Sequence, residues 1–482
     1  MVMLEKLNKM NSFKVARTVT VVILNFALVT STRRSRQSGL LIHHKSSEYN
    51  TTHPTRSASD DLDCFGIHLP NKCFCQMYQG NLDIACTNAG LVSAPRFDMS
   101  GQTVHTLNLS NNAIREIAFG DFYGNNILRL QLSHNDIAAL NNLAFWGLEH
   151  SLGTLNLSYN KLQNVPGASL RVLRVLRSLI LTGNQITRIH SYAFVGLGQL
   201  EVFVVDDNPI IQIDQFAFEG TNFYRLKLDR IALPNGAQSI PTEHLRTLKG
   251  LWLVRNEITM IPDRWFSNLT SLRYVDLSRN NLTALSQRAF CNLSKSLHTL
   301  DLSRNNFQEL PKDTLRYLTS LNTLKMSGNR IEELPHRSFN CSKNLETLDL
   351  SDNRIASLSR SAFHGLDTLR RLDLRNNRIL TLHKKVFYWS NLSSRQVFLS
   401  GNPFVCNCVL KWLKKEHRRS SSLVAVFADL MEMRCSKPLY FEGRRIVRIP
   451  MKEFHCHHEY YYYYDYDDQA TRRKVEKMSV IG

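Results

Sequence analysis

The sequence of 482 residues lacks the short signatures of common catalytic sites. It has no H-E-x-x-H, G-x-S-x-G, G-x-x-x-x-G-K-[ST] or G-x-G-x-x-G pattern, so zinc-protease, serine-hydrolase, P-loop and dinucleotide-binding chemistry find no support. Its histidines are scattered among turns and flanking segments. We therefore predict that the protein is not an enzyme, and we predict no cofactor and no metal site.

Long hydrophobic runs are almost absent. The one apolar stretch, "TVTVVILNFALV" at 18–29, is shorter than the roughly 20 apolar residues needed to cross a bilayer. It follows four basic residues and precedes small polar ones, an order typical of a secretory signal, although Asn25 interrupts it and no clear A-x-A site follows. The end of the sequence also lacks the apolar tail of a lipid-anchor signal. We expect a signal peptide at 1–32, secretion to the extracellular space and no stable membrane insertion.

Acidic residues are outnumbered: 41 Asp and Glu stand against 60 Lys and Arg, which gives a formal net charge of +19. A secreted protein this basic can be drawn to polyanions such as glycosaminoglycans. A merely soluble basic surface explains the charge equally well. No feature of the sequence points to nucleic acid.

What the sequence does contain is a repeat, seen in "LETLDLSDNRI" at 345–355, with apolar residues at positions 1, 4, 6 and 11 and asparagine at position 9. A thirteenth copy, "FYRLKLDRIAL" at 223–233, has Ile231 at position 9. Successive copies are 23 to 25 residues apart, within the period of leucine-rich repeats. The position-9 asparagines are Asn112, Asn135, Asn160, Asn184, Asn208, Asn256, Asn280, Asn305, Asn329, Asn353, Asn377 and Asn402.

Positions 4 and 6 point to the same side of an extended strand, so each repeat supplies one short strand whose apolar side chains face a shared core. We therefore predict an α/β solenoid of about 13 repeats: a right-handed leucine-rich-repeat horseshoe with a parallel, concave β-sheet. The asparagine amides should bind buried backbone groups, each of which costs about 1–3 kcal/mol if left unpaired. Ile231 cannot do this, so we expect irregular structure in repeat 6 and in the link at 232–244.

A second periodic feature lies ten residues after the asparagine. We expect these side chains to stack inside the solenoid, each burial contributing roughly 1.5–3 kcal/mol. They are Phe122, Phe145, Phe194, Phe218, Phe266, Phe290, Phe339, Phe363 and Phe387, with Leu170 and Leu315 in the same register.

Cysteines flank the repeats, where a solenoid must cap its exposed core. With "NPFVCNCVLKWL" at 402–413, the chain over 64–456 resembles extracellular leucine-rich-repeat proteins with cysteine-rich flanking modules, such as Slit-like and Toll-like ectodomains and acid-labile-subunit-like carriers. The wide gap between Cys64 and Cys73 departs from that pattern. The resemblance implies the pairs Cys64–Cys75, Cys73–Cys86, Cys406–Cys435 and Cys408–Cys456, and Trp412 packing over the last repeat.

Sequence alone leaves three connectivities open for each cap. A zinc site at "HCHH", 455–458, is the rival interpretation, which is disfavoured because ligands clustered on one stretch rarely close a tetrahedron. Cys291 and Cys341 remain over, and we expect both to be buried free thiols. The expected organisation is a signal peptide at 1–32, a disordered segment at 33–63, a cap at 64–100, repeats at 101–402, a cap at 403–456 and a disordered Tyr/Asp-rich tail at 457–482.

Two kinds of modification site support secretion without proving occupancy. N-x-S/T sequons, the acceptors of N-glycans, begin at Asn50, Asn108, Asn156, Asn268, Asn281, Asn292, Asn340 and Asn391. Glycans at Asn108 and Asn156 would lie on the strand face. The tail "EYYYYYDYDDQ" offers tyrosines beside acids as sulfation candidates, namely Tyr460, Tyr461, Tyr462, Tyr463, Tyr464 and Tyr466; an unmodified flexible end is the alternative.

Positions 2, 3, 5, 7 and 8 of each repeat are free of core constraints and face the concave side or its edge. In repeats 6 to 8 they carry Trp, Tyr and basic residues, the types that dominate binding hot spots. Repeat 5 just before them carries Glu201, Asp206 and Asp207, which should give the patch a sharp acidic edge. The predicted patch is Tyr224, Arg225, Lys227, Arg230, Lys249, Trp252, Arg255, Arg273, Tyr274 and Arg279.

These features favour a secreted, non-catalytic scaffold that binds an extracellular protein through its concave face. The resemblance implies adhesion, signalling modulation or innate immune recognition without choosing among them. The alternative is an extracellular-matrix component that binds glycosaminoglycan or collagen.

Overall fold

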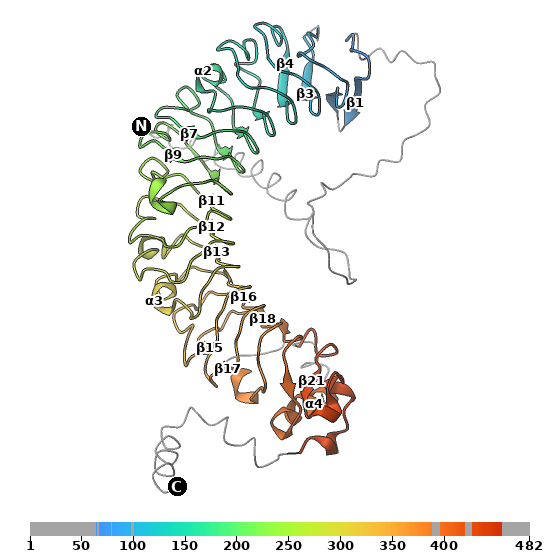
Figure 1. Cartoon of the computed structure of the whole chain (residues 1–482), viewed down its shortest axis with the longest axis vertical. Coiled ribbons are helices and arrows are strands. Elements are labelled where there is room, and N and C mark those ends of the chain that lie inside the picture. Colours follow the sequence, from blue (N-terminus) through green and yellow to red (C-terminus); the bar gives the residue numbers. More distant parts are fainter. Residues whose placement is uncertain are drawn as a thin grey trace, which may run out of the picture. The chain divides into compact units, whose positions relative to one another are not determined.

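The computed structural model describes residue 64 and residues 67–78, 80–97, 101–387, 396–419 and 427–455 (Figure 1). All of them belong to one unit, residues 62–482. The predicted signal peptide, the segment at 33–63, the tail with its sulfation candidates, Cys456, Asn50 and Asn391 lie outside the described residues.

One 15-stranded sheet runs through the whole repeat region. Its first two strands, β1 (Phe74–Tyr78) and β2 (Asn81–Ala85), are antiparallel, and every later pair is parallel. Thirteen strands, one for each repeat, follow in chain order. They are β3 (Thr103–Asn108), β4 (Asn126–Gln131), β5 (Thr154–Asn156), β6 (Ser178–Ile180), β8 (Val202–Val204), β10 (Arg225–Lys227), β11 (Gly250–Trp252), β12 (Tyr274–Asp276), β13 (Thr299–Asp301), β14 (Thr323–Lys325), β16 (Thr347–Asp349), β18 (Arg371–Asp373) and β19 (Gln396–Phe398).

The strands pair in register, with position 4 of one repeat beside position 4 of the next. Leu300 pairs with Leu324, for example, and Leu324 pairs with Leu348. These leucines are buried, as are those at position 6, whereas positions 3 and 5 point to the opposite side of the sheet, which we call the sheet face. The solenoid of about 13 turns with one parallel sheet is therefore confirmed.

The side of the coil away from the sheet face consists of turns and very short elements (Figure 1). The predicted phenylalanines are buried there and stack between repeats, as in Phe266 and Phe290, whose ring centroids are 4.6 Å apart. The short elements are α2 (Gly167–Leu170), α3 (Lys312–Leu315), η1 (Gly236–Ser239), η2 (Cys291–Leu293), η3 (Lys384–Phe387), β7 (Arg188–Ile189) paired with β9 (Gln212–Ile213), and β15 (Glu333–Leu334) paired with β17 (Ser357–Leu358).

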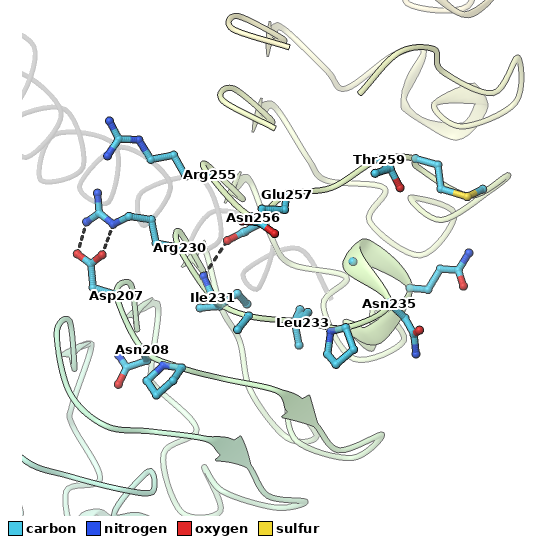
Figure 2. A pocket seen from close by; sticks show the side chains of 16 residues that line it. Asp207, Asn208, Arg230, Ile231, Leu233, Asn235, Arg255, Asn256, Glu257 and Thr259 are labelled. Carbon is cyan, nitrogen blue, oxygen red and sulfur yellow. Dashed lines mark hydrogen bonds and ion pairs between the residues drawn. The ribbon is translucent and has the colours of Figure 1, made fainter. Parts of the chain in front are cut away.

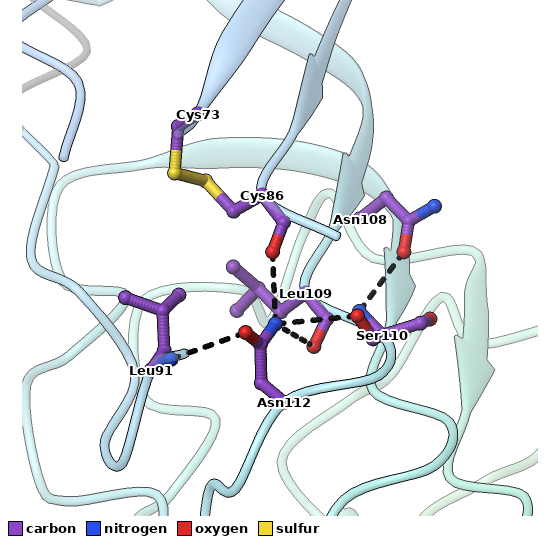
Figure 3. Close-up of a disulfide and its surroundings, with 7 residues drawn as sticks. All are labelled: Cys73, Cys86, Leu91, Asn108, Leu109, Ser110 and Asn112. Carbon is purple, nitrogen blue, oxygen red and sulfur yellow. Dashed lines mark hydrogen bonds between the residues drawn. A yellow bond between two sulfur atoms is a disulfide. The ribbon is translucent and has the colours of Figure 1, made fainter. Parts of the chain in front are cut away.

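The position-9 asparagines form a buried ladder of hydrogen bonds. Asn305 Nδ2 donates to the carbonyls of Leu277 (2.9 Å) and Leu302 (3.0 Å), and its Oδ1 accepts the N–H of Leu282 at 3.0 Å. Each amide thus joins its own repeat to the previous one. The ladder starts on the N-terminal cap, where Asn112 Nδ2 donates to the carbonyl of Cys86 at 2.8 Å (Figure 3).

Repeat 6 breaks this ladder but not the sheet. Its strand β10 pairs in register with both neighbours, so the predicted irregularity does not reach the strand. With Ile231 at position 9, the N–H of Ile210 bonds to the carbonyl of Asn208 in its own repeat (2.8 Å) instead of to a side chain. The irregularity is confined to the link after the strand, where η1 begins at Gly236.

Disulfides close both ends. The described cap residues contain Cys64–Cys75, Cys73–Cys86 and Cys406–Cys435, the pairs that the resemblance implied. Cys408 is also disulfide-bonded, and its implied partner Cys456 lies outside the described residues.

The C-terminal cap is built from short elements around the last repeat. Trp412 Nε1 donates to the carbonyl of Leu382 at 2.8 Å, and its ring lies 6.3 Å from that of Phe387, so the indole covers the last phenylalanine of the series, in repeat 12. The Asp429 carboxylate accepts the N–H groups of Leu399 (2.9 Å) and Ser400 (2.7 Å), which no further repeat covers. The elements are β20 (Phe404–Val405), paired with β21 (Cys435–Lys437), η5 (Cys408–Leu410), α4 (Lys411–Arg419), η6 (Leu439–Phe441), η7 (Ile446–Arg448) and η8 (Met451–Glu453).

The expectation for the two remaining cysteines is wrong in one respect. Both are free thiols, but neither is buried: Cys291 is half-buried and Cys341 is exposed. Cys291 directly follows the buried Phe290, and Cys341 lies two residues after the buried Phe339. At both places the chain turns outward to solvent.

Candidate binding face

The predicted patch residues come together on adjacent strands, because β10, β11 and β12 pair in register. Tyr224, Arg225, Arg230, Arg273 and Arg279 are exposed, whereas Lys227, Lys249, Trp252, Arg255 and Tyr274 are half-buried. The ten side chains divide into an aromatic centre, a group around Tyr224, two ion-paired cations, and three arginines that have no carboxylate partner among the described residues.

The centre is a pair of aromatic rings. Trp252 and Tyr274 have ring centroids 4.8 Å apart and planes inclined by 31°. The indole lies back over Gly250, where a Cβ atom would come within 2.6 Å of the ring, so a side chain at this position would displace the indole. The Tyr274 hydroxyl donates to Asp276 Oδ2 at 3.2 Å. The two rings therefore form a fixed, half-buried platform on the sheet face.

Electrostatics keep the Tyr274 hydroxyl protonated. Burial raises the pKa of Tyr274, and the nearby carboxylates of Asp276 and Asp301 raise it further. Burial likewise raises the pKa of Asp276. The phenol therefore remains a hydrogen-bond donor at every physiological pH.

Tyr224 lies beside the platform with two cations over its ring. Lys249 Nζ is 4.7 Å and Arg225 Cζ is 5.9 Å from the ring centroid, both within cation–π range. These contacts hold the long basic side chains above the sheet and reduce the conformational entropy they would lose on binding.

The acidic residues of repeat 5 do not form the separate edge that we expected from the sequence. Asp206 forms an ion pair with Lys227, and Asp207 bonds to the guanidinium of Arg230 through both of its oxygens. Side chains of adjacent repeats touch, so Asp206 and Asp207 neutralise two patch cations instead of bordering them, and Glu201 pairs with Arg177 of repeat 4 at 2.5 Å.

Asp229 is the one strongly perturbed carboxyl near the patch. Burial raises its pKa to about 6, and the charge of Asp206 acts in the same direction. Lys227, 3.0 Å away, opposes the shift only in part. Burial lowers the pKa of Lys227, but its contacts with Asp206 and Asp229 outweigh this and the net shift is upward.

A cavity of about 870 Å³ opens beside the patch at the ladder break (Figure 2). Its lining includes Arg230, Arg255, Leu233, Asn235 and Met260, and Figure 2 shows Arg230 and Arg255 on the opposite side of Leu233 from Asn235. Sequence reasoning missed it. The missing asparagine at Ile231 and the Pro- and Gly-containing link were the available signals.

Exposed apolar side chains on the side away from the sheet were also missed. They lie in repeats 1 to 5, and Tyr192 and Phe216 stack on one another with centroids 5.9 Å apart. The sheet periodicity gives no sign of them, because they occur in the connecting segments. They are Phe119, Tyr123, Leu143, Trp146, Tyr192, Val195 and Phe216.

The candidate N-glycosylation sites leave part of the sheet face, and part of the side away from it, free for a partner. Asn108 and Asn156 lie on β3 and β5 and are half-buried. In the described part of the chain, the sequons outside the strands, Asn268, Asn281, Asn292 and Asn340, all follow the predicted patch or lie beside its last repeats.

Within the described ranges, no three His, Cys, Asp or Glu side chains are grouped so as to hold a metal ion. None of the helices found among those residues has the length and apolar character needed to span a membrane.

Comparison with known proteins follows the repeats. A family model described as "Leucine rich repeat" matches residues 102–162, 150–210, 246–296, 295–355 and 343–404. The matches cover more than half of the chain. They leave out the stretch around Ile231, where the ladder is broken.

Curated relatives match at low identity. Lumican of Gallus gallus is 28% identical over 228 residues, 47% of this chain and 64% of that protein. Decorin of Oryctolagus cuniculus is 30% identical over 265 residues, 54% of this chain and 70% of decorin. Toll-like receptor 3 of Bos taurus is 30% identical over 37% of this chain and 22% of the receptor. The chain thus spans less than two thirds of the lumican and the receptor.

Among solved structures, the Toll–Spatzle complex of Drosophila superposes with a TM-score of 0.56 at 21% identity, covering 72% of this chain and 54% of that chain. At this identity the likeness concerns the fold alone.

Proposed function

The chain belongs to the leucine-rich-repeat family, and from that premise we propose that it is a secreted, non-catalytic scaffold that binds an extracellular protein through the sheet face of repeats 6 to 8. The observation that carries the proposal is the Trp252–Tyr274 platform surrounded by Tyr224, Lys249 and Arg273. Aromatic and arginine side chains held in place on a rigid surface are the usual centres of protein interfaces.

The partner's surface follows from this chemistry. An apolar or aromatic side chain would cover the platform, and carboxylates around it would meet Lys249, Arg225 and Arg273. Lys227 and Arg230 contribute less, because Asp206 and Asp207 already neutralise them. We therefore expect an acidic protein segment with an exposed hydrophobic residue at its centre.

Affinity capture from extracellular fluid tests the proposal. The bait is the wild-type chain, compared with the double variant Trp252→Ala, Arg255→Ala. The matched control is Trp146→Ala, Arg171→Ala, which removes the same two residue types from the side away from the sheet. We expect one partner to be lost with the first variant only. Equal recovery of every partner by all three baits would remove the patch from consideration, provided that circular dichroism shows all three folded.

A matrix component that binds glycosaminoglycan or collagen is the second candidate, and the excess of Lys and Arg over Asp and Glu, which persists without the segment at 1–32, favours it. A salt gradient on immobilised heparin separates the two candidates. Elution near physiological salt would argue against the matrix function, because weakly held basic surfaces are screened at that ionic strength.

Secretion is part of the proposal and has its own test. Expression of the full chain in cultured animal cells should deliver a glycoprotein to the medium, with a new N-terminus after residue 32. Retention in the cell fraction with no glycan would contradict it.

A further inference from the structure

We propose that Arg230, Arg255, Arg279 and Arg304, the arginine row, bind a sulfated glycosaminoglycan chain that runs across repeats 6 to 9 along the edge of the sheet. The row is distinct from the aromatic platform. It would give the second candidate function a location, and it does not depend on the protein-binding proposal.

The four residues occupy position 8 of four consecutive repeats, just beyond the ends of β10, β11, β12 and β13. They share one backbone conformation, with φ of 53°, 58°, 59° and 56°. Neighbouring strands lie about 4.8 Å apart, so the row places four guanidinium-bearing residues at regular steps over roughly 15 Å. A polymer with regularly repeated charges fits such an array better than a single small anion.

The fold gives no reason for arginine at these positions. A positive φ costs a residue with a Cβ atom on the order of 1 kcal/mol, and glycine, asparagine and aspartate bear it best. Most other repeats follow that rule at position 8, where Asn111, Gly183, Asp207, Gly328, Asp352, Asn376 and Gly401 stand. Four adjacent arginines in this conformation therefore point to a use other than folding.

The charge of the row is largely uncompensated. Among the described residues, Arg255, Arg279 and Arg304 have no carboxylate within ion-pair distance, and Arg230 alone is paired, with Asp207. The pKa of Arg279 is lowered by partial burial and by the charges of Arg304 and Arg255. Bound anionic groups would relieve this repulsion.

Arg230, Arg279 and Arg304 are exposed, and Arg255 is half-buried. Figure 2 shows Arg230 and Arg255 one above the other, projecting to the same side and away from Ile231 and Leu233. Their planar guanidinium groups can donate paired hydrogen bonds to oxyanions. Asp207 in repeat 5 and Gly328 in repeat 10 stand at the same position on either side of the row, so the row spans four repeats.

A sulfated polysaccharide suits the row better than a polynucleotide. Proteins that hold single-stranded nucleic acids add aromatic side chains on which the bases stack. The rings of the same repeats, Trp252 and Tyr274, lie at strand positions 5 and 3 and pack on one another, so no ring alternates with the position-8 arginines along the row. Nucleic-acid binding is therefore an outcome of the test, not the proposal.

The test measures binding of the full glycosylated chain to heparin, with Arg279→Glu, Arg304→Glu as the variant. The control is Arg264→Glu, Arg337→Glu. These two arginines are also exposed and have φ of 56° and 52°, so net charge and backbone strain change equally. We expect the row variant to bind heparin at least about tenfold more weakly, because two charge-assisted contacts to sulfate groups are lost and two like charges are introduced. The control should remain within about threefold of wild type.

Equal weakening in both variants would overturn the proposal, since it would mean that the whole basic surface acts without a site. Unchanged heparin binding in the row variant would also overturn it, as would a variant that loses polynucleotide binding but keeps heparin. Desulfated heparin should bind weakly to every form. Trp252→Ala alone, which leaves Arg255 of the row in place, should lose the captured protein partner but keep heparin binding, so failure of the protein-binding proposal is distinguishable from failure of this one.

Discussion

Repeats 7 to 13 and repeat 6 differ in what accepts a hydrogen bond from a buried backbone N–H of the repeat before them. In the later repeats each position-9 asparagine accepts an N–H of the repeat before it, as Asn305 does from Leu282. At repeat 6 there is no such amide, and the N–H of Ile210 turns back to Asn208 within its own repeat. The end of the array repeats this solution, because the N–H of Phe404 bonds to the carbonyl of Asn402 at 3.0 Å.

The comparison shows that the fold requires a hydrogen-bond acceptor for each of these buried backbone N–H groups, and that the acceptor need not be an asparagine. At repeat 6 a hydrogen bond within one repeat replaces the bond to the amide side chain. The hydrogen bond that the amide would make between neighbouring repeats is therefore absent. The cavity and the cation-rich patch lie at that break, where the chain is freest to depart from the repeat pattern.

The largest expected effect is removal of an amide from the unbroken ladder. Asn305→Ala leaves the Leu282 N–H and two carbonyl contacts buried without a partner, and we expect a loss of roughly 3 kcal/mol in the free energy of unfolding. Urea denaturation measures it. Asn306→Ala, one residue along and half-buried, is the control and should cost less than about 1 kcal/mol. Similar losses in both variants would show that the ladder is not special.

A smaller effect is expected at the C-terminal end, where Asp429 takes the place of a further repeat. Asp429→Ala should lower the free energy of unfolding by about 2 kcal/mol, because the N–H groups of Leu399 and Ser400 lose their acceptor. Asp429→Asn keeps one acceptor oxygen and should cost about half as much. If the alanine variant melts like wild type, the end is held by the disulfides alone.

The free energy of unfolding should also depend on pH through Asp229, which lies at the ladder break in repeat 6. The pKa of Asp229 is raised to about 6, above its value in an unfolded chain, so the folded state binds this proton more tightly. The resulting stabilisation is fully present below about pH 4 and is lost as pH rises through about 6.

Asp229→Asn retains an oxygen for the N–H of Val254 and buries no charge. We expect it to gain about 1 kcal/mol at pH 7.5 and to weaken the difference between pH 5 and pH 7.5 in urea midpoints. Glu257→Gln, which changes an exposed carboxylate of the cavity beside the patch, should keep the wild-type difference. An Asp229→Asn chain with an unaltered pH dependence would contradict the assignment.

The smallest effect is expected for restoring the ladder. Ile231→Asn supplies an amide for Ile210 but removes a buried aliphatic side chain, and these terms nearly offset. We expect a change of less than about 1 kcal/mol in the free energy of unfolding. A loss as large as that of Asn305→Ala would show that repeat 6 cannot accept the common solution.

The repeat pattern predicted the fold well because each recurring residue type occupies one fixed position in the repeat and has the same structural role in every repeat. The leucines, the asparagines and the phenylalanine series all lie where the period places them. The described disulfide pairs match what the resemblance implied.

The candidate site was predicted less completely, since contacts between repeats depend on side-chain directions that spacing does not give. Position counting placed Trp252 and Tyr274 on neighbouring strands, but not the ring of Trp252 over Gly250. It missed that Asp206 and Asp207 neutralise two patch cations. Arg304 was overlooked because the left-handed backbone at position 8 is visible only in the structure.

Hydrogen–deuterium exchange of the free chain and of the chain with its captured protein partner tests the account most directly. We predict new protection in the peptides that contain β10, β11 and β12, with little change elsewhere. Protection confined to the exposed aromatic residues of repeats 1 to 5, around Trp146 and Tyr192, or to either cap, would contradict it.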